Sequence, residues 1–517
     1  MPFLFPPKMA PKSSTATTRH HTRLLLWYAF ASRLLVLTLI ILWRSILSPY
    51  DTSASINPPC LSSSSSPNSS IPNLKSLPIL LPGLGAAIEN SIVWDSVYFI
   101  RIAECGYEYE QSYAFFPLLP LCISLISRTI FAPMVPIIGY RAVLGLSGYV
   151  LNNIAFVFAA FYLYRLSLAV LKDPEVALRA SILFCFNPAS IFYSSIYSES
   201  LYALSSIGGL YYFMHGADNY ATFLLALSGS ARSNGVLSAG YICFRTMQQA
   251  YDAYFIRKRA FSALQVILAG ALRSLCIIFL FVSFQAYGYL NICMGLSPDE
   301  MRPWCKKRLP LLYSYIQSHY WGVGFLGYFQ VKQLPNFLLA SPILSLALCS
   351  IIYYVKLWPE VFLSLGFRTA SVDKESFGSA SFLVKDTGPA TSGLSEKETS
   401  NLWQDDPTLR QRKQAIKGEK SIALQSKSEA VDRLQCVPVA ILPFVLHLSF
   451  MVATAFFAMH VQVSTRFLSA SPSLFWFASH IVGSSGSGKI WGHFIWAYCA
   501  AYIFLGSLLF SNFYPFT

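Results

Sequence analysis

The stretch from residue 94 to residue 120 carries an unusual density of side chains that can do chemistry. It reads WDSVYFIRIAECGYEYEQSYAFFPLLP and lies between two apolar segments, residues 24–47 and 115–131. Carboxylates this close to a membrane-length apolar segment are costly unless they face water or take part in chemistry. A cluster of this kind can accept a proton or bind a polar substrate. Its charged residues are Asp95, Arg101, Glu104, Glu108 and Glu110.

The same stretch predicts a short amphipathic helix on the membrane surface. Trp94, Tyr98, Arg101 and Cys105 recur at roughly helical spacing, and aromatic side chains favour the membrane–water boundary. Gly106 would end this helix, because glycine is the usual residue just past a helix C-terminus. The simplest interpretation is an interfacial anchor with a solvated acidic face.

The composition predicts an all-α polytopic membrane protein. Of the 517 residues, 54% are hydrophobic and only 12% are charged, which is about half the charged fraction of a soluble protein. Many stretches approach the roughly 20 apolar residues that one crossing needs, so about eight to eleven crossings are expected. The candidate segments are residues 24–47, 115–131, 141–163, 176–193, 201–214, 221–241, 261–289, 336–354, 437–459, 473–482 and 491–510.

Charge and composition also set the expected topology. The N-terminal tail is basic and has no acid, which favours a cytosolic N-terminus followed by a retained first crossing. One long charged stretch, rich in Ser, Thr and Gly, has the composition of a disordered loop. The expected parts are a cytosolic tail (1–23), a membrane bundle (24–355) with luminal loops (48–114 and 291–335), a disordered cytosolic loop (356–436), and C-terminal membrane helices (437–517) with a luminal motif (460–466).

The net charge of +14 does not indicate nucleic-acid binding, because the basic residues are spread over loops between apolar segments. The eleven cysteines include no CxxC pair and no Cys/His metal spacing, so neither a zinc site nor a dense disulfide framework is expected. Whether Cys293 and Cys305 pair across one loop stays open. The sequon at Asn68 lies where this topology places the lumen, so Asn68 is a candidate glycosylation site.

Four further polar stretches interrupt the apolar background. Each has a structural explanation of its own: Asn187-Pro188 as a kink, Glu199 as a paired membrane carboxylate, Arg232 and Arg466 as residues near crossing ends. Together they place acids, two arginines and a histidine at crossing ends, which predicts one polar chamber. The stretches are residues 187–201 (NPASIFYSSIYSESL), 232–240 (RSNGVLSAG), 319–329 (HYWGVGFLGYF) and 460–472 (HVQVSTRFLSASP).

With residues 94–120, these motifs resemble the GPI mannosyltransferase 2 family of the PIG-V type. The resemblance rests on WDSVYFIRIAECGYEYE with AFFPLLP, NPASIFYSSIYSESL, RSNGVL and HVQVSTRFLSASP. It implies a GT-C-type glycosyltransferase bundle in the endoplasmic reticulum membrane, with its active site and an interfacial helix on the luminal side. It also implies dolichyl phosphate mannose as the donor and a mannosylated glucosaminyl-phosphatidylinositol as the acceptor. The product would carry a second mannose in α-1,6 linkage.

The residue chemistry agrees with a lipid-phosphate donor. The sequence has no Asp-x-Asp pair, the usual clamp for a metal-bound nucleotide sugar. A lipid phosphate can leave without a metal or other cofactor if cationic side chains accept its charge. Arg232, His460 and Arg466 are the candidates for that role. Asp95 is the best candidate for the general base that accepts the proton of the acceptor hydroxyl.

Other polar and aromatic residues of these motifs are candidates for binding substrate. The glutamates would bind sugar hydroxyls or hold the arginines in place, and the aromatic rings would stack on sugar or isoprene. Membrane lipids and a small membrane subunit are further candidate partners. The predicted site comprises catalytic Asp95, no metal, and the binding residues Trp94, Arg101, Glu104, Glu108, Glu199, Arg232, Asn234, Tyr320, Trp321, His460, Gln462 and Arg466.

Two other classes of protein compete with this interpretation. A secondary transporter also has broken helices and intramembrane charges, with Glu199 and Arg232 as a coupling pair, but the sequence shows no internal repeat. A non-catalytic subunit of a membrane glycosylation complex predicts that replacing Asp95 is harmless. Transfer of labelled mannose by the purified protein separates the enzyme from both alternatives.

Overall fold

The structure is a computed structural model that describes residues 13–50, 60–61, 79–294, 301–367, 438–514 and 516. Within these ranges the chain is helical and forms no β-strand, which confirms the expected all-α class. In chain order the elements are α1 (Ser13–Ile46), α2 (Pro82–Asn90), α3 (Asp95–Cys105), η3 (Glu110–Ala114), α4 (Leu118–Arg128), η4 (Ala132–Met134), α5 (Val135–Ile138), α6 (Tyr140–Leu171), α7 (Pro174–Cys185), α8 (Ser190–Ser194), α9 (Glu199–Met214), α10 (Asp218–Ala231), η5 (Ser233–Ser238), α11 (Ala239–Tyr251), η6 (Asp252–Ile256), α12 (Ala260–Cys293), α13 (Leu312–Trp321), η7 (Val331–Gln333), α14 (Leu334–Leu357), α15 (Pro359–Leu363), α18 (Pro438–Phe457), η8 (Val461–Val463), α19 (Ser464–Leu468), α20 (Pro472–Val482) and α21 (Ser487–Ser511).

Six of the described helical segments are long and apolar enough to cross a membrane. A seventh candidate joins Leu118–Arg128 to Ala132–Ile138 across a bend of 68°. The chain is therefore a multi-span membrane protein with six or seven candidate crossings in its described part, fewer than the eight to eleven expected. The six are Thr17–Ile46, Tyr140–Leu171, Ala260–Cys293, Val331–Leu357, Val439–Phe457 and Gly488–Ser511.

Four short helices account for the difference. α7, α9, α10 and α20 contain 12, 16, 14 and 11 residues, fewer than the roughly 20 that one crossing needs. α9 packs between α6 and α10, and α7 packs between α6 and α20. Their apolar composition serves packing inside the protein, and composition alone does not distinguish that from contact with lipid.

One expected crossing, residues 221–241, is wrong as a continuous helix. α10 ends before Arg232, whose backbone is extended with a φ of −150°. The chain then turns through η5, where Gly235 packs so closely on the Ser228 backbone that a Cβ would have no room. Irregular backbone at membrane depth is tolerated where it is buried in protein, and this break brings the Arg232 side chain into the interior.

A second break follows α7 at the Asn-Pro motif. The Asn187 side chain accepts a hydrogen bond from the Ala189 N–H at 2.8 Å and donates one to the Phe184 carbonyl at 2.7 Å. These bonds satisfy backbone groups that the interrupted helix leaves unpaired. The chain can therefore continue through α8 to α9 without leaving these backbone N–H and carbonyl groups unpaired.

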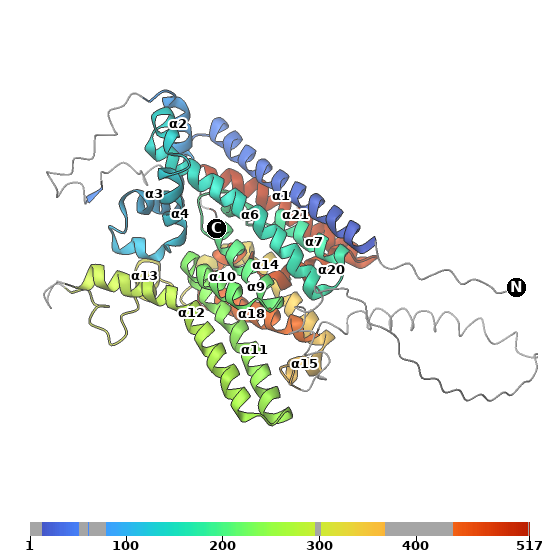
Figure 1. Cartoon of the computed structure of the whole chain (residues 1–517). Coiled ribbons are helices and arrows are strands. Elements are labelled where there is room, and N and C mark those ends of the chain that lie inside the picture. Colours follow the sequence, from blue (N-terminus) through green and yellow to red (C-terminus); the bar gives the residue numbers. More distant parts are fainter. Residues whose placement is uncertain are drawn as a thin grey trace, which may run out of the picture.

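The long helices form the body of the molecule. Figure 1 shows α1, α6 and α21 lying side by side, with α7 and α20 next to them, and α1 contacts both α6 and α21. α11 and α12 pack together as a hairpin that projects from the body. α2, α3 and α4 gather at the opposite end of α1 from its N-terminus.

α3 ends at Gly106, as expected, and this glycine has a φ of +79° that side chains disfavour. Its apolar face packs on protein, because Phe99, Ile100 and Ala103 join a buried cluster with Leu119 of α4. α3 is thus held by α4 and α6. The side chains of Glu104 and Glu108 are only 13% and 6% exposed, so the acidic face that the simple interpretation expected to be solvated is largely buried. The packing of α3 also fixes the position of Asp95, its first residue.

Candidate active site

A cavity of about 490 Å³ lies where the motif-bearing elements meet. Its wall is formed by the start of α3, the connection between α8 and α9, η5, one face of α13, the η8–α19 segment and the end of α21. We call this cavity the chamber. It brings together eight of the predicted site residues: Trp94, Asp95, Arg232, Asn234, Trp321, His460, Gln462 and Arg466.

Asp95 is the only carboxylate among the described residues that line the chamber. Its side chain is 34% exposed, so it is accessible from the cavity. Asp95 Oδ2 accepts hydrogen bonds from Nη1 and Nη2 of Arg466, each at 3.3 Å, and the Asp95 N–H donates to the Tyr197 hydroxyl at 3.1 Å. The carboxylate is therefore both held in place and open to a substrate.

Trp94, which precedes it, has a backbone φ of +54° in a region that non-glycine residues rarely adopt. Its indole N–H donates to the Phe510 carbonyl at 3.1 Å, and its ring lies 5.8 Å from that of Phe513. The ring is therefore anchored to the end of α21 while it lines the chamber. This anchor holds the turn that directs Asp95 toward Arg466.

Glu199 lies behind this pair with a side chain only 2% exposed. Its Oε1 forms an ion pair with Arg466 Nε at 3.4 Å and another with Arg232 Nη1. Glu199 does not line the chamber. One buried carboxylate thus holds two guanidiniums, which is the arrangement expected of a residue that keeps Arg232 in place rather than of a base that meets substrate.

The electrostatics of this cluster keep Arg466 charged. Burial by itself would lower the pKa of Arg466, but the neighbouring Glu199 and Asp95 outweigh it and raise the pKa above its ordinary value. Burial, followed by the nearby Asp95 charge, raises the pKa of the Tyr197 phenol well above its usual range. The phenol therefore stays protonated, and two carboxylates balance two guanidiniums.

His460 and Gln462 form the wall that faces this cluster from the η8 segment. The His460 ring stacks on Tyr328 with 4.6 Å between centroids, and the Tyr328 hydroxyl donates to Gln462 Oε1 at 2.7 Å. From η5, the buried Asn234 Nδ2 has no hydrogen-bond partner in the described part of the chain. A buried donor without a partner is a candidate to bind a substrate oxygen.

Arg101, Glu104, Glu108 and Tyr320, also predicted as site residues, do not line the chamber. Arg101 Nη2 pairs with Glu108 Oε2 at 2.6 Å, and Glu104 pairs with Arg141 Nε at 3.3 Å. Glu108 therefore holds Arg101, one of the two arginines that the glutamates were predicted to hold, whereas Glu104 holds Arg141, which lies outside the predicted site. The sequence pattern alone did not separate these structural pairs from the residues of the chamber.

Tyr320 is also engaged within the protein. Its hydroxyl donates to Glu110 Oε2 at 2.7 Å, and the Trp304 indole N–H donates to Glu110 Oε1 at 2.5 Å. Burial and this bond to Glu110 raise the pKa of Tyr320 to about 12. Glu110 thereby joins α13 and the loop before it to η3, and this places Trp321, the next residue, on the chamber wall.

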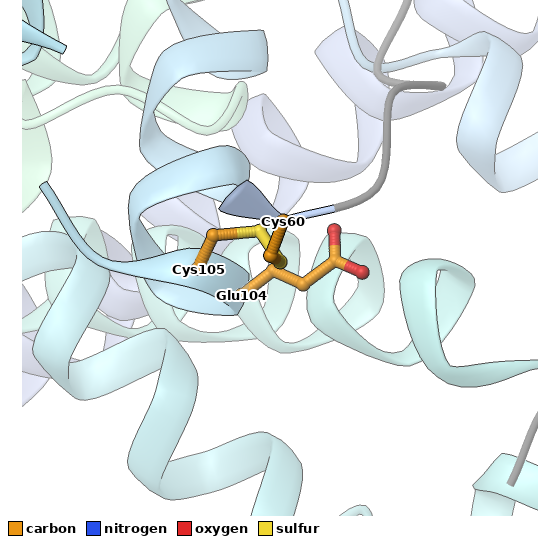
Figure 2. Close-up of side chains that lie close together, drawn as sticks. All are labelled: Cys60, Glu104 and Cys105. Atoms are coloured by element: carbon orange, nitrogen blue, oxygen red, sulfur yellow. A yellow bond between two sulfur atoms is a disulfide. The ribbon is translucent and has the colours of Figure 1, made fainter. Parts of the chain in front are cut away.

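Two disulfides fasten the same region, Cys60–Cys105 and Cys293–Cys305. The second answers the question that the sequence left open, and the first was not predicted. Figure 2 shows Cys60 and Cys105 joined beside Glu104. These three side chains are close enough to hold an ion, but sulfurs joined in a disulfide offer no thiolate. Asn68 lies outside the described residues.

Several chamber residues were missed from the sequence. Tyr197, Tyr313 and Gln317 line the cavity, and the Ser233 hydroxyl donates to the Tyr313 hydroxyl at 2.9 Å. Tyr313, Gln317 and Trp321 recur every four residues, so they share one face of α13. That spacing was the available signal, and it would have pointed from Trp321 to the other two.

Fold and site together define a multi-span helical membrane protein with a polar chamber suited to a polar, anionic substrate. The profile of the family described as Mannosyltransferase (PIG-V) matches residues 22–517. The chain therefore belongs to the mannosyltransferase (PIG-V) family, and it is an enzyme that transfers mannose. No solved structure matches the chain.

Individual relatives agree with this assignment. The chain is 31% identical over 369 residues to "GPI alpha-1,6-mannosyltransferase 2" of Cricetulus griseus, covering 68% of this chain and 72% of the relative. It is 28% identical over 476 residues to the protein of the same name from Homo sapiens, covering 88% and 83%. "GPI mannosyltransferase 2" of Drosophila pseudoobscura pseudoobscura is 29% identical over 458 residues, covering 82% and 86%.

Proposed function

We propose that the chamber is the site at which mannose passes from dolichyl phosphate mannose to the first mannose of a GPI precursor. As a member of its family, the chain is a GPI α-1,6-mannosyltransferase that adds the second mannose in GPI-anchor biosynthesis. The observation that carries the assignment of the site is Asp95, the only lining carboxylate among the described residues, beside Arg232 and Arg466.

In the proposed reaction, the acceptor hydroxyl oxygen attacks the anomeric carbon of the donor mannose. The bond between that carbon and the phosphate oxygen breaks, and dolichyl phosphate leaves with the bonding electrons. The hydroxyl proton goes to Asp95, which acts as the general base. A single carboxylate among the described lining residues fits one direct displacement, because a glycosyl–enzyme intermediate would need a nucleophilic carboxylate in addition to the base.

Charge balance explains why Arg466 contacts the base. The donor phosphate gains one negative charge when it becomes the leaving group, while Asp95 loses its charge by accepting the proton. Arg466 then has one carboxylate fewer to neutralise and can pair with the phosphate. Glu199 pairs with both arginines from behind the chamber and keeps them aimed into it.

The same proposal places the chamber on the luminal side of the endoplasmic reticulum membrane, in a GT-C-type bundle with α3 at the interface. Disulfides form and persist in oxidising compartments. The Cys60–Cys105 disulfide lies at the C-terminal end of α3. The Cys293–Cys305 disulfide is adjacent in sequence to Trp304, whose indole N–H donates to Glu110. Both bridges belong to the segments that build the chamber, which supports its luminal position.

The direct test uses the purified full-length protein, dolichyl phosphate carrying labelled mannose, and a synthetic mannosylated glucosaminyl-phosphatidylinositol. We expect labelled acceptor with an α-1,6 linkage, and no product from a nucleotide-sugar donor. Failure to transfer by folded parental protein, together with retention in vivo of activity by an Asp95→Asn variant, would favour the non-catalytic subunit. Uptake of a solute into vesicles without transfer would favour the transporter.

A further inference from the structure

A second cavity lies far from the chamber, between the first turns of α1 and the C-terminal part of α6. Its volume is about 650 Å³. We call it the basic cavity, because the described residues that line it offer guanidiniums, hydroxyls and two apolar side chains but no carboxylate. Its lining residues are Thr18, Arg19, Thr22, Arg23, Leu26, Phe161 and Arg165.

The basic cavity is about one membrane thickness from the chamber. Trp43 of α1 donates to the Ser507 hydroxyl at 3.0 Å, and Phe510, close to Ser507 on α21, lines the chamber. Arg19 precedes Trp43 by 24 residues, which is about 36 Å along a helix. The hydrocarbon core of a bilayer is about 30 Å thick. The two cavities therefore open near opposite faces of the membrane and cannot share one substrate.

The positive charge of this cavity is not compensated within the described protein. Arg19 and Arg23 are exposed and have neither an ion pair nor a side-chain hydrogen bond there. Arg165 donates from Nη2 to the Tyr211 hydroxyl at 3.4 Å, and its guanidinium lies 5.9 Å from the centroid of that ring. Glu175, in the first turn of α7, forms its ion pair with His21 of α1 at 3.3 Å. Three guanidiniums thus surround one hollow, and no described carboxylate pairs with any of them.

The shape of the cavity suits an amphiphile. Leu26 is 38% exposed, and further along α1 Trp27 and Phe30 are 63% and 52% exposed. An apolar track therefore leaves the basic cavity along the membrane-facing side of α1. A ligand with a phosphate at the arginines and an acyl chain on this track would satisfy both parts of the surface.

We propose that the basic cavity binds the headgroup phosphate of an anionic phospholipid. All three cations are arginines, whose planar fork grips two phosphate oxygens at once. The Thr22 hydroxyl donates to the Thr18 carbonyl at 2.8 Å, so the phosphate contacts in this proposal come from the three guanidiniums. With the N-terminus in the cytosol, the cavity opens to the leaflet that carries anionic lipids. The bound lipid would hold the start of α1 against α6.

The test measures thermal stabilisation of the full-length protein in neutral detergent as short-chain lipid is added. Dioctanoyl phosphatidic acid should raise the unfolding midpoint in a saturable way, whereas dioctanoyl phosphatidylcholine and inorganic phosphate should have little effect at the same concentration. Each of Arg19→Gln, Arg23→Gln and Arg165→Gln should weaken apparent binding about five-fold, and the triple variant about one hundred-fold. Arg128→Gln, at an exposed arginine that lines none of these cavities, is the control and should bind like the parent.

Several outcomes would overturn the assignment. Equal stabilisation by both lipids would show that only the acyl chains bind. Equal stabilisation by inorganic phosphate would show an anion site that does not recognise lipid. Unchanged binding of phosphatidic acid by the triple variant would place the lipid elsewhere. If the triple variant does not fold, the single variants decide, because five-fold losses at all three positions, with none in Arg128→Gln, require the phosphate to lie among them. No arm involves mannose transfer, so the result is independent of the active site.

Discussion

Asp95 and Glu199 both pair with Arg466, but they stand in different surroundings. Asp95 is 34% exposed in the chamber, whereas Glu199 is 2% exposed and contacts both arginines. A general base must meet the proton that it accepts, and a buried carboxylate between two cations is better suited to hold them. At the residue scale, exposure rather than residue type therefore separates the proposed general base from the carboxylate that supports it.

The first prediction is that Asp95→Asn lowers mannose transfer by about 10²–10⁴-fold, the usual contribution of a general base. Asn keeps the shape and can still accept a hydrogen bond from Arg466, but it cannot take a proton at neutral pH. The measurement is transfer per molecule of correctly inserted protein. Glu104→Gln, outside the chamber, is the matched control and should keep most of the activity. Near-parental specific activity of Asp95→Asn would remove Asp95 from the mechanism.

The second prediction is that Arg466→Lys impairs transfer about ten- to one hundred-fold although the positive charge is kept. Arg466 uses Nη1 and Nη2 toward Asp95 and Nε toward Glu199. A single ammonium cannot occupy all three positions. Kinetics with dolichyl phosphate mannose as the varied substrate would measure this loss. A lysine variant that transfers at the parental rate would show that charge alone is sufficient.

The chemistry of these residues could be predicted from the sequence, but their partners could not. Motifs identified Asp95, Arg232 and Arg466 as polar groups at crossing ends, and all three line the chamber. Asp95 and Arg466 are separated by 371 positions, so no local pattern reports their contact. Glu104 was expected in the same site because its type and spacing match the motif, and only the fold reveals its pairing with Arg141.

At the scale of elements, a buried arginine in the first crossing joins α1 to the broken helix behind the chamber. Arg33 Nη1 donates to the Ser190 carbonyl and the Ser194 hydroxyl, each at 3.0 Å, and Nη2 donates to the Cys185 carbonyl at 3.1 Å. Its guanidinium lies 3.8 Å from the centroid of Phe156. The arginine thereby satisfies one carbonyl at the end of α7 and one at the start of α8, in the segment that leads to Tyr197 and Glu199.

The third prediction is that Arg33→Leu lowers the free energy of unfolding by about 2 kcal/mol or more, since buried carbonyls lose their donors. Arg44→Leu is the matched control on the same helix, because Arg44 is part-buried and has one bond, to the Ser511 carbonyl at 3.3 Å. Thermal unfolding of both variants in one detergent makes the comparison. Equal stability of the two would show that Arg33 is not a clamp.

This arginine also shows where sequence reasoning about the elements ended. An isolated charge inside an apolar run is a functional or structural signal in its own right. From the length of residues 24–47, however, only a membrane crossing was predicted, with no role for Arg33. Two breaks between helices, at Asn187-Pro188 and at Arg232, fall within the polar motifs that were identified from the sequence. The internal packing of α7, α9, α10 and α20 was harder to predict, because protein and lipid surroundings select the same apolar side chains.

At the scale of the whole molecule, the chamber unites segments expected on one side of the membrane. Tyr313 and Trp321 come from residues 291–335, Asp95 from residues 48–114, and Arg466 from residues 460–466. The fourth prediction is that these three segments are luminal and that residue 400 is cytosolic. A sequon introduced near residue 400 should stay unglycosylated, whereas one placed near residue 308 should acquire a glycan. A glycan on the sequon near residue 400 would show that this stretch is luminal and would contradict the predicted topology.

The last prediction concerns the stretch between α15 and α18, which separates two well-packed ends. Gly366 lies beside Val439, since a Cβ on Gly366 would be 3.5 Å from the Val439 side chain. α15 also packs on α18, and Gln248 of α11 holds the Leu365 carbonyl. The chain therefore leaves and re-enters the described structure at nearly the same place, and a short linker can span the gap.

Replacing residues 370–434 with a short Gly-Ser linker should leave mannose transfer per inserted molecule close to the parental value. Closing a shorter loop costs little and favours folding slightly, because loop entropy grows only with the logarithm of length. The control is a deletion that also removes residues 359–367, which should destabilise the protein because it takes away the packing of α15 on α18. If the linker variant is inserted and as stable as the parent but inactive, the stretch has a role in the reaction that its composition does not indicate.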